Sequence, residues 1–417
     1  MYTNIPQLDR VAASVPRWLE RVPLYRQLAP EPLGARPGFA DRFRALPIIT
    51  KRDIREGFPG NFLPPGTELD QLLDRDLVEL ERTSGTAEEP TPLILGRGWW
   101  TEQEQVALRL NRRVARELEP AARRVTLVSP VCSGEICYSG IPSFSDRAVG
   151  NALFVNLSRH PFFWSEQSLA RMARETVEWN PVFLDVDPVY GTLFALYCER
   201  HALRLPALKF IICSYEFLST AHRRVLARVF RVPVYNLYGS TETGHLLMED
   251  ESGHLVPSLP TAFLELVNRD ALGIGDLVVT TLSNDFMPLI RYGIGDLARQ
   301  ETTPAGETIF ELHGRSRDAL VAPGGARITV AQVDLALAPW AGLVHYQLRQ
   351  RDEDHYTLFY VPERAANETG PPAQVRSQLA DLLPHARVDF EAADHIPCEG
   401  SGKFRLCLPL EPHEGGS

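Results

Sequence analysis

The residues best suited to nucleotide chemistry begin with a short loop of hydroxyl residues around a glycine. The loop reads TSGTAEEP, runs from Thr83 to Pro90 and lies ahead of an expected helix. Backbone N–H groups and hydroxyls in such a loop can approach a phosphate closely, because glycine has no side chain to block it. An ordinary Ser/Gly/Pro turn is the alternative interpretation.

A second segment, VYNLYGSTETG, runs from Val234 to Gly244 directly after an apolar strand. Tyr238 offers a flat ring that could stack on a base, and Thr241 offers a hydroxyl for a phosphate or carboxylate oxygen. Glu242 offers a hard oxygen ligand suited to Mg²⁺. The alternative is a strand-end turn in which the tyrosine covers the core and the glutamate is solvated.

Two further segments lie nearer the C-terminus. In PLIRYGIGDLARQ, Asp296 could accept two ribose hydroxyls, and Arg315 in HGRSRD could contact ribose or phosphate oxygens. In IPCEGSGKFRL, Lys403 sits in a glycine-rich loop, which favours a mobile, unpacked lysine that docks onto a substrate. A hairpin turn, a surface arginine and an exposed loop lysine are the alternatives. We nevertheless expect a specific role for a lysine here, because only three of the 43 basic residues are lysines: Lys51, Lys209 and Lys403.

Length and charge restrict the class of protein. A chain of 417 residues exceeds what one hydrophobic core usually organises, so at least two domains are expected. A net charge of −10 argues against nucleic acid or an anionic membrane as a partner. The sequence has no signal-like N-terminus, no run approaching the roughly 20 apolar residues of a spanning helix, and no CxxC pair. We therefore expect a cytoplasmic protein with buried free thiols.

Strands and helices alternate through the middle of the chain. Strands are expected in RVTLVSP, NPVFLDVDP, ALKFIICS and PVYNLYG, with helices over 165–179, 189–203 and 219–230. A longer helix is expected over 101–120, from a Thr101–Glu104 capping box to Pro120, and the stretch 69–82 should form one or two helices. The alternation predicts a mostly parallel sheet with helices on its faces and ligands at the carboxyl ends of the strands.

The pattern changes after Gly244 to short strands and turns, which predict an antiparallel, barrel-like unit. Beyond Arg315, helices over 328–338 and 373–383, two strands around the turn RDED and a strand over 386–392 predict a compact α+β unit. We place the domain boundary between 316 and 317. A large domain would then cover 1–316 and a small one 317–417.

Taken together, the four segments resemble the adenylate-forming superfamily of acyl-CoA synthetases, adenylation domains and luciferases. The resemblance covers about residues 45 to 410, and LPIITKRDIREGFP, NPVFLDVDPVY and VVTTLSNDFMPLIRYGIGDLA are similar to the phenylacetate-CoA ligase and coenzyme F390 synthetase branch. It implies an α/β fold whose large N-terminal domain combines mostly parallel sheets and helices with a barrel-like β unit. It also implies a small, mobile α+β C-terminal lid.

The resemblance implies roles for individual residues. Contacts to ATP or AMP are expected at loop and strand-end positions. The phosphates would be bound by Thr83, Ser84, Gly85 and Thr86, and the adenine by Ser214, Tyr215, Glu216, Asn236, Tyr238 and Gly239. The ribose and its surroundings would be bound by Asp296 and Arg315. Catalysis is expected at Thr241, at Glu242 as the Mg²⁺ ligand, and at Lys403, which the small domain delivers for adenylation. Arg317 or Asp318 matches the hinge between the domains.

The implied reaction joins a carboxylic acid to the α-phosphate of ATP and releases pyrophosphate. The acyl group then passes to the thiol of CoA or a carrier protein, or to an amine. Because an anion must meet a polyanion, Mg²⁺ on Glu242 and the ammonium of Lys403 would offset the developing charge. An aromatic acid is expected from the branch and from aromatic residues near the expected acyl pocket, namely Tyr138, Phe144, Phe162, Phe163 and Trp164. Packing in the core is the alternative for these side chains.

One departure from the family pattern leaves a second function open. The family's phosphate loop continues with glycine and often lysine, whereas Ala87, Glu88 and Glu89 stand here. Two solvated carboxylates within 4 Å of a triphosphate would oppose its binding by about 1 kcal/mol each. The alternative is therefore a degenerate relative that binds an aryl acid, a nucleotide or a protein partner without turnover. The sequence does not specify the acid, the acceptor or the oligomeric state.

Overall fold

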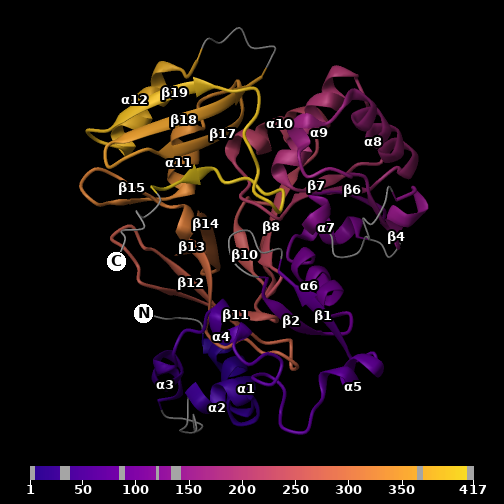
Figure 1. Cartoon of the computed structure of the whole chain (residues 1–417), viewed down its shortest axis with the longest axis vertical. Helices are drawn as coiled ribbons and strands as arrows, with labels where there is room; N and C mark the ends of the chain where they lie inside the picture. The colour runs from indigo at the N-terminus through magenta and orange to yellow at the C-terminus, as the bar shows by residue number, and fades with distance from the viewer. Residues whose placement is uncertain are drawn as a thin grey trace. The chain divides into compact units, whose positions relative to one another are not determined.

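A computed structural model describes residues 5–28, 38–83, 90–118, 122–132, 142–363 and 370–410 (Figure 1). The chain forms two compact units, each built from two stretches of sequence: unit 1 combines 1–115 with 237–311, and unit 2 combines 116–236 with 312–417. The expected division into 1–316 and 317–417 stays a prediction. Its boundary lies close to the third crossing between the units, at 311–312.

Unit 1 begins with short helices followed by a hairpin. The elements are α1 (Ile5–Arg21), α2 (Pro23–Leu28), α3 (Phe39–Ala45), α4 (Lys51–Arg55), α5 (Leu69–Asp74), β1 (Val78–Arg82), β2 (Pro92–Gly96), α6 (Trp99–Leu108) and α7 (Arg112–Glu117), whose last residues belong to unit 2. The expectation of only helices over 69–82 is wrong, because α5 ends at Asp74 and the alternating sequence VELER pairs with β2 as a strand. The loop from Thr83 to Pro90 therefore connects two antiparallel strands, ahead of α6.

The single helix expected over 101–120 is also wrong. Helix α6 starts at Trp99, after Gly98 in the left-handed conformation, and a break separates it from α7. Thr101 thus lies within the first turn, so the expected Thr101–Glu104 capping box does not form. A glycine that caps the N-terminus without a side chain gives a weaker sequence signal than the Thr/Glu pair that follows it.

The antiparallel strands expected after Gly244 are confirmed in unit 1. They are β9 (Gly244–Glu249), β10 (Leu255–Pro257), β11 (Ala262–Val267), β12 (Ile274–Thr281), β13 (Tyr292–Thr302) and β14 (Thr308–Arg315), which passes into unit 2. In the described part of the chain their order is β9-β10-β14-β13-β12-β11. The expected unit is barrel-like, and the structure gives its strands as one ladder in this order.

Unit 2 contains the expected parallel sheet, in the order β8-β7-β6-β3-β5, with the short β4 antiparallel at its edge. The strands are β3 (Arg124–Leu127), β4 (Ala148–Val149), β5 (Ala152–Phe154), β6 (Phe183–Val186), β7 (Phe210–Cys213) and β8 (Val234–Ser240), whose last residues belong to unit 1. Helices α8 (Glu166–Trp179), α9 (Pro188–Arg200) and α10 (Thr220–Phe230) follow the predicted ranges, and residues of all three helices share one apolar core with these strands. The α/β fold class is confirmed.

The register of this sheet aligns the carboxyl ends of its strands. Leu127 of β3 pairs with Val186 of β6, Val186 pairs with Cys213 of β7, and Cys213 pairs with Asn236 of β8. The residues that follow these strands must therefore leave the sheet side by side, at one edge.

The C-terminal stretch of unit 2 has the predicted α+β composition. Its elements are β15 (Leu320–Val321), β16 (Arg327–Ile328), α11 (Val330–Leu337), β17 (Leu343–Gln350), β18 (His355–Pro362), α12 (Ala373–Leu382), β19 (Arg387–Ala392) and β20 (Cys407–Leu408). Helices α11 and α12 pack on the sheet β19-β18-β17-β20 through Val333, Leu337, Val375 and Leu379 (Figure 1). Four described cysteines are free thiols, and Cys198, Cys213 and Cys407 among them are buried. In the described residues no helix is both long and apolar enough to span a bilayer.

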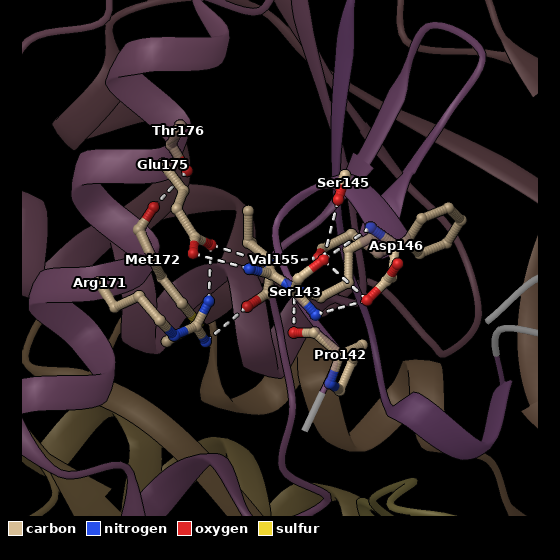
Figure 2. A network of polar contacts seen from close by, with 11 residues as sticks. Pro142, Ser143, Ser145, Asp146, Val155, Arg171, Met172, Glu175 and Thr176 are labelled. Carbon is tan, nitrogen blue, oxygen red and sulfur yellow. Dashed lines mark hydrogen bonds and ion pairs between the residues drawn. The ribbon is translucent and has the colours of Figure 1, made fainter. Parts of the chain in front are cut away.

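A polar network fixes helix α8 to the segment before β4. Glu175 accepts hydrogen bonds from Arg147 (2.7 and 2.8 Å) and from Arg171 (2.6 Å), and the Arg147 side chain is only 3% exposed. Figure 2 shows Glu175 and Arg171 on the helix, with Ser143 and Asp146 on the facing segment. One carboxylate thus compensates two guanidinium groups in a largely buried position.

Glu175→Ala should lower the free energy of unfolding by about 3 kcal/mol, because removing one partner of a buried ion pair leaves the other charge uncompensated. Urea denaturation measures this. Glu178→Ala, an exposed change on the same helix, is the control and should shift stability by less than about 0.5 kcal/mol. Equal small effects of both changes would contradict the structural role of this network.

Candidate functional site

Three polar residues follow the aligned strands of unit 2. Ser129 comes after β3, Asp187 directly after β6, and Glu216 after β7. The strand register places these turns at one edge of the sheet. In parallel sheets this edge is the usual place for a ligand.

The loop that carries Lys403 is packed onto this edge. The hydroxyl of Ser129 donates to the carbonyl oxygen of Ser401 (2.6 Å), and the hydroxyl of Tyr190 donates to that of Gly402 (3.0 Å). A Cβ at Gly402 would lie 2.6 Å from the Tyr190 hydroxyl and closer still to that of Ser129. The expectation of an unpacked loop is therefore wrong. Glycine is required at 402 because two side-chain hydroxyls occupy the space of a Cβ and because φ is 86°.

Two carboxyl groups face this loop. Glu216 accepts a hydrogen bond from the backbone N–H of Phe404, at 2.6 Å. Asp187 caps helix α9 by accepting from the N–H groups of Val189 (2.9 Å) and Tyr190 (3.4 Å). Pro188 at the first helical position is the sequence signal for that cap.

Burial raises the pKa of both carboxyl groups. It raises the pKa of Asp187 to about 7, opposed by the α9 N–H groups, the ammonium of Lys403 and a hydrogen bond with Glu216. Burial and the neighbouring Asp187 raise the pKa of Glu216 well above its usual value, again opposed by Lys403. The lysine therefore lies near two carboxyl groups that compete for protons.

The expected hinge residues connect to the same loop. Asp318 is buried and accepts a hydrogen bond from Arg405 (2.7 Å), and the guanidinium of Arg317 lies 3.4 Å from the Glu399 carboxylate. Arg315 ends strand β14 and precedes this turn. Ion pairs thus join both ends of the Lys403 loop to the turn at 316–318.

The segment expected to line the adenine follows β7 in unit 2. The hydroxyls of Ser214 (3.1 Å) and Tyr215 (3.2 Å) both donate to the carboxylate of Asp185. Tyr215 has a φ of 75°, a strained value for a residue with a side chain, and its ring is partly exposed. Asn236 pairs with Cys213 in the neighbouring strand β8.

In unit 1 the structure brings together the tyrosine expected to stack on the base and the aspartate expected to bind the ribose. The hydroxyl of Tyr238 donates to one carboxylate oxygen of Asp296 at 2.7 Å, and Asp296 is buried. Gly239 lies at a register shift between β8 and β9, where a Cβ would collide with the backbone of Gly244. Thr241 is half-buried in the turn between these strands.

The expected metal ligand is also in unit 1. Glu242 is buried and accepts a hydrogen bond from the hydroxyl of Tyr292 at 3.1 Å. The Lys51 ammonium lies 3.3 Å from the same carboxylate oxygen. The described residues contain no group of three or more His, Cys, Asp or Glu side chains that could hold a metal. A single carboxylate suits Mg²⁺ when nucleotide phosphates and water supply the other ligands, so Glu242 would hold the ion together with the nucleotide.

Several predicted residues lie elsewhere or outside the described residues. Ser84, Gly85 and Thr86 fall outside, as do Glu88 and Glu89. Thr83 is buried at the base of their loop, where its hydroxyl accepts the N–H of Thr91 at 2.9 Å.

The aromatic residues proposed for an acyl pocket divide in the same way. Tyr138 lies outside the described residues, and Phe163 is 67% exposed. Phe144, Phe162 and Trp164 pack against the core of unit 2, as the alternative interpretation held.

Sequence reasoning missed the residues that hold the Lys403 loop. Ser129, Tyr190 and Asp187 give no motif of their own, although Ser129 and Asp187 each follow an apolar strand and precede a proline. The sequence predicts no role for Lys51, although this rare lysine lies in the segment LPIITKRDIREGFP. Its contact with Glu242 joins residues that are distant in sequence, which no local pattern shows.

Comparison with known proteins finds a curated relative over most of the chain. The chain is 26% identical to the phenylacetate-coenzyme A ligase of Thermus thermophilus over 374 residues, which are 83% of this chain and 78% of the relative. No family model matches the chain.

Solved structures share the fold. A 2-hydroxyisobutyryl-CoA ligase in complex with 2-HIB-AMP superposes with a TM-score of 0.70 at 18% identity, over 98% of this chain and 89% of that one. The amide bond synthetase McbA from Marinactinospora thermotolerans superposes with a TM-score of 0.55 at 14% identity, over 82% of this chain and 70% of that one.

Asp187→Asn should change how stability depends on pH. The folded-state pKa of about 7 exceeds the ordinary 3.8, so the contribution of Asp187 is complete below pH 3.8 and is lost as the pH rises to 7. In wild type Asp187 and Glu216 both contribute to this loss, because the pKa of each is raised, at about 1.4 kcal/mol per pH unit for each group, and asparagine, which still caps α9, should remove the contribution of Asp187. Denaturation between pH 4 and 8 measures the difference. Asp354→Asn, in an exposed turn, is the control, and parallel curves for wild type and Asp187→Asn would contradict the assignment.

Glu242→Gln should raise the Mg²⁺ concentration needed for nucleotide binding by about ten-fold or more, because an amide is a poorer ligand than a carboxylate. Lys51→Ala should lower it, since the ammonium competes for the same oxygen. A titration of ATP binding with Mg²⁺ measures both, and Lys209→Ala removes an exposed lysine as control. An unchanged requirement in Glu242→Gln would exclude Glu242 as the ligand.

Proposed function

We propose, from the premise that the chain is an adenylate-forming homologue of the phenylacetate-CoA ligases, that it activates a carboxylic acid with ATP and passes the acyl group to an acceptor. The observation that carries the proposal is the packing of the loop around Lys403 on the carboxyl edge of the parallel sheet. An ammonium held at that edge can meet an anionic substrate without first ordering a loop, which saves the entropy of positioning.

In the first step a carboxylate oxygen of the acid attacks the α-phosphorus of ATP. The new oxygen–phosphorus bond forms as the bond to the β-phosphate bridging oxygen breaks, and pyrophosphate leaves. Lys403 would stabilise the negative charge on the α-phosphate. Mg²⁺, held by Glu242 and the phosphates, would supply further charge neutralisation. In unit 1, Tyr238 and Asp296 would bind the base and the ribose.

In the second step a thiol attacks the acyl carbon, the carbon–oxygen bond breaks and AMP leaves. We propose CoA as the thiol, because a relative that covers 83% of the chain and a solved structure that covers 98% of it are both named CoA ligases. An amine acceptor is supported by the likeness to an amide bond synthetase. A carrier-protein thiol as the acceptor is supported only by the resemblance to the wider superfamily.

We propose an aromatic acid, supported by the phenylacetate-CoA ligase of Thermus thermophilus. The 2-hydroxyisobutyryl-CoA ligase shows that the fold also serves a small aliphatic acid. Pyrophosphate release with a panel of aryl and small aliphatic acids would decide between them.

The degenerate, non-catalytic relative is retained as a second candidate because of one observation. The ion pair between Lys51 and Glu242 neutralises the expected metal ligand. Nucleotide binding without pyrophosphate release from any acid would favour this candidate.

Lys403→Ala should lower ATP–pyrophosphate exchange by about 10²-fold or more, because it removes a preorganised charge from the α-phosphate. AMP binding, measured by calorimetry, should stay nearly unchanged. The control is Lys209→Ala, which removes the same charge from an exposed position. An exchange rate in Lys403→Ala equal to that of wild type would reject the role of the lysine.

A further inference from the structure

The proposed reaction assigns no role to the buried carboxyl groups of Asp187 and Glu216. Glu216 was expected to line the adenine, yet its Oε1 accepts the N–H of Phe404, the residue after Lys403. Because this bond is made to the backbone, it fixes the loop itself. A carboxyl group buried for adenine contact alone would have no need of this partner.

The other charged groups around the loop are already engaged. Glu399, in the same loop, lies 3.4 Å from the guanidinium of Arg317 and 4.0 Å from that of Arg405. Arg159 donates to the carbonyl oxygen of Gly400 at 3.0 Å. Tyr190 and Cys398 are neutral, because burial raises the pKa of both. Asp187 and Glu216 therefore remain as the carboxyl groups that face one ammonium.

The surroundings of the two carboxyls decide which one holds the proton. Asp187 accepts two N–H groups at the N-terminus of α9, where the helix dipole also favours a negative charge. Glu216 has one backbone donor and a hydrogen bond with Asp187. We therefore expect Asp187 to carry the negative charge and Glu216 to carry the proton.

We propose that Glu216 is a positioning residue for Lys403: as a neutral carboxyl it accepts the N–H of Phe404 and donates its hydrogen to Asp187, so that one carboxylate faces one ammonium. The inference rests on the proposed function only in taking Lys403 as the adenylation lysine. It predicts that glutamine replaces Glu216 well, since an amide also offers one acceptor and a donor.

Alkylation of Cys398 reports on the loop without any substrate. Its Sγ lies 3.4 Å from the carbonyl oxygen of Arg159 and 3.3 Å from Nδ1 of His160, so release of the loop would break both contacts and expose this partly buried thiol further. The full chain is treated with N-ethylmaleimide, and the tryptic peptide that ends at Lys403 is quantified by mass spectrometry. Glu216→Leu should label about ten-fold faster or more, because a buried N–H loses its acceptor. Glu216→Gln should label at the wild-type rate.

Kinetics separates positioning from nucleotide contact. For pyrophosphate release, Glu216→Leu should lower kcat by about ten-fold or more with the KM for ATP little changed. Glu216→Gln should restore most of kcat. A raised KM for ATP with unchanged kcat in Glu216→Leu would overturn the proposal and return Glu216 to the adenine site. A Gln variant as defective as the Leu variant would overturn the neutral state of Glu216.

Failure of the proposed function gives a different result. If no acid yields pyrophosphate but Glu216→Leu labels faster and Glu216→Gln does not, the loop contact is supported and the activity is rejected. If both variants label at the wild-type rate while their melting curves match wild type, the positioning is overturned whatever the activity.

Discussion

The contact on which the rest of unit 2 depends is the close approach of the 401–404 backbone to the carboxyl edge of the parallel sheet. It requires a residue without a side chain at 402, because the hydroxyls of Ser129 and Tyr190 occupy the space of a Cβ. It also requires strand ends that are level, which the register of β3, β6 and β7 provides. Given these two conditions, the ammonium of Lys403 comes to lie beside the buried carboxyls of Asp187 and Glu216.

Charge is balanced in the same way in both units. In unit 1 Lys51 faces the buried carboxylate of Glu242, and in unit 2 Lys403 faces Asp187 and Glu216. Two of the three lysines in a chain that otherwise uses arginine thus meet buried carboxyl groups. A lysine suits such positions because its ammonium is a compact charge on a flexible stem and can move from one anion to another. The planar guanidinium of arginine instead favours one bidentate geometry. In the proposed reaction, Lys51 and Lys403 would exchange these carboxylates for the phosphates of ATP.

Local sequence predicted much of this fold. The helices over 165–179 and 219–230 and the strands between them follow from periodicity and from the Ser165 and Ser219 caps. The helix start at Trp99 could not be predicted, since Gly98 caps it without a side chain. Contiguous motifs predict roles for Tyr238, Glu242 and Lys403, and these roles stay predictions. The partners of Lys403 come from three strand ends, and only the strand register brings them together, so no linear pattern shows them.

The most direct measurement follows an oxygen atom. The chain is incubated with ATP, Mg²⁺, CoA and a mixture of carboxylic acids labelled with ¹⁸O in the carboxylate, and the products are analysed by mass spectrometry. If the acid oxygen attacks the α-phosphorus and the carbon–oxygen bond later breaks, one labelled oxygen must appear in AMP. Label in inorganic phosphate together with ADP, or no labelled AMP from any acid in the mixture, would contradict adenylate formation.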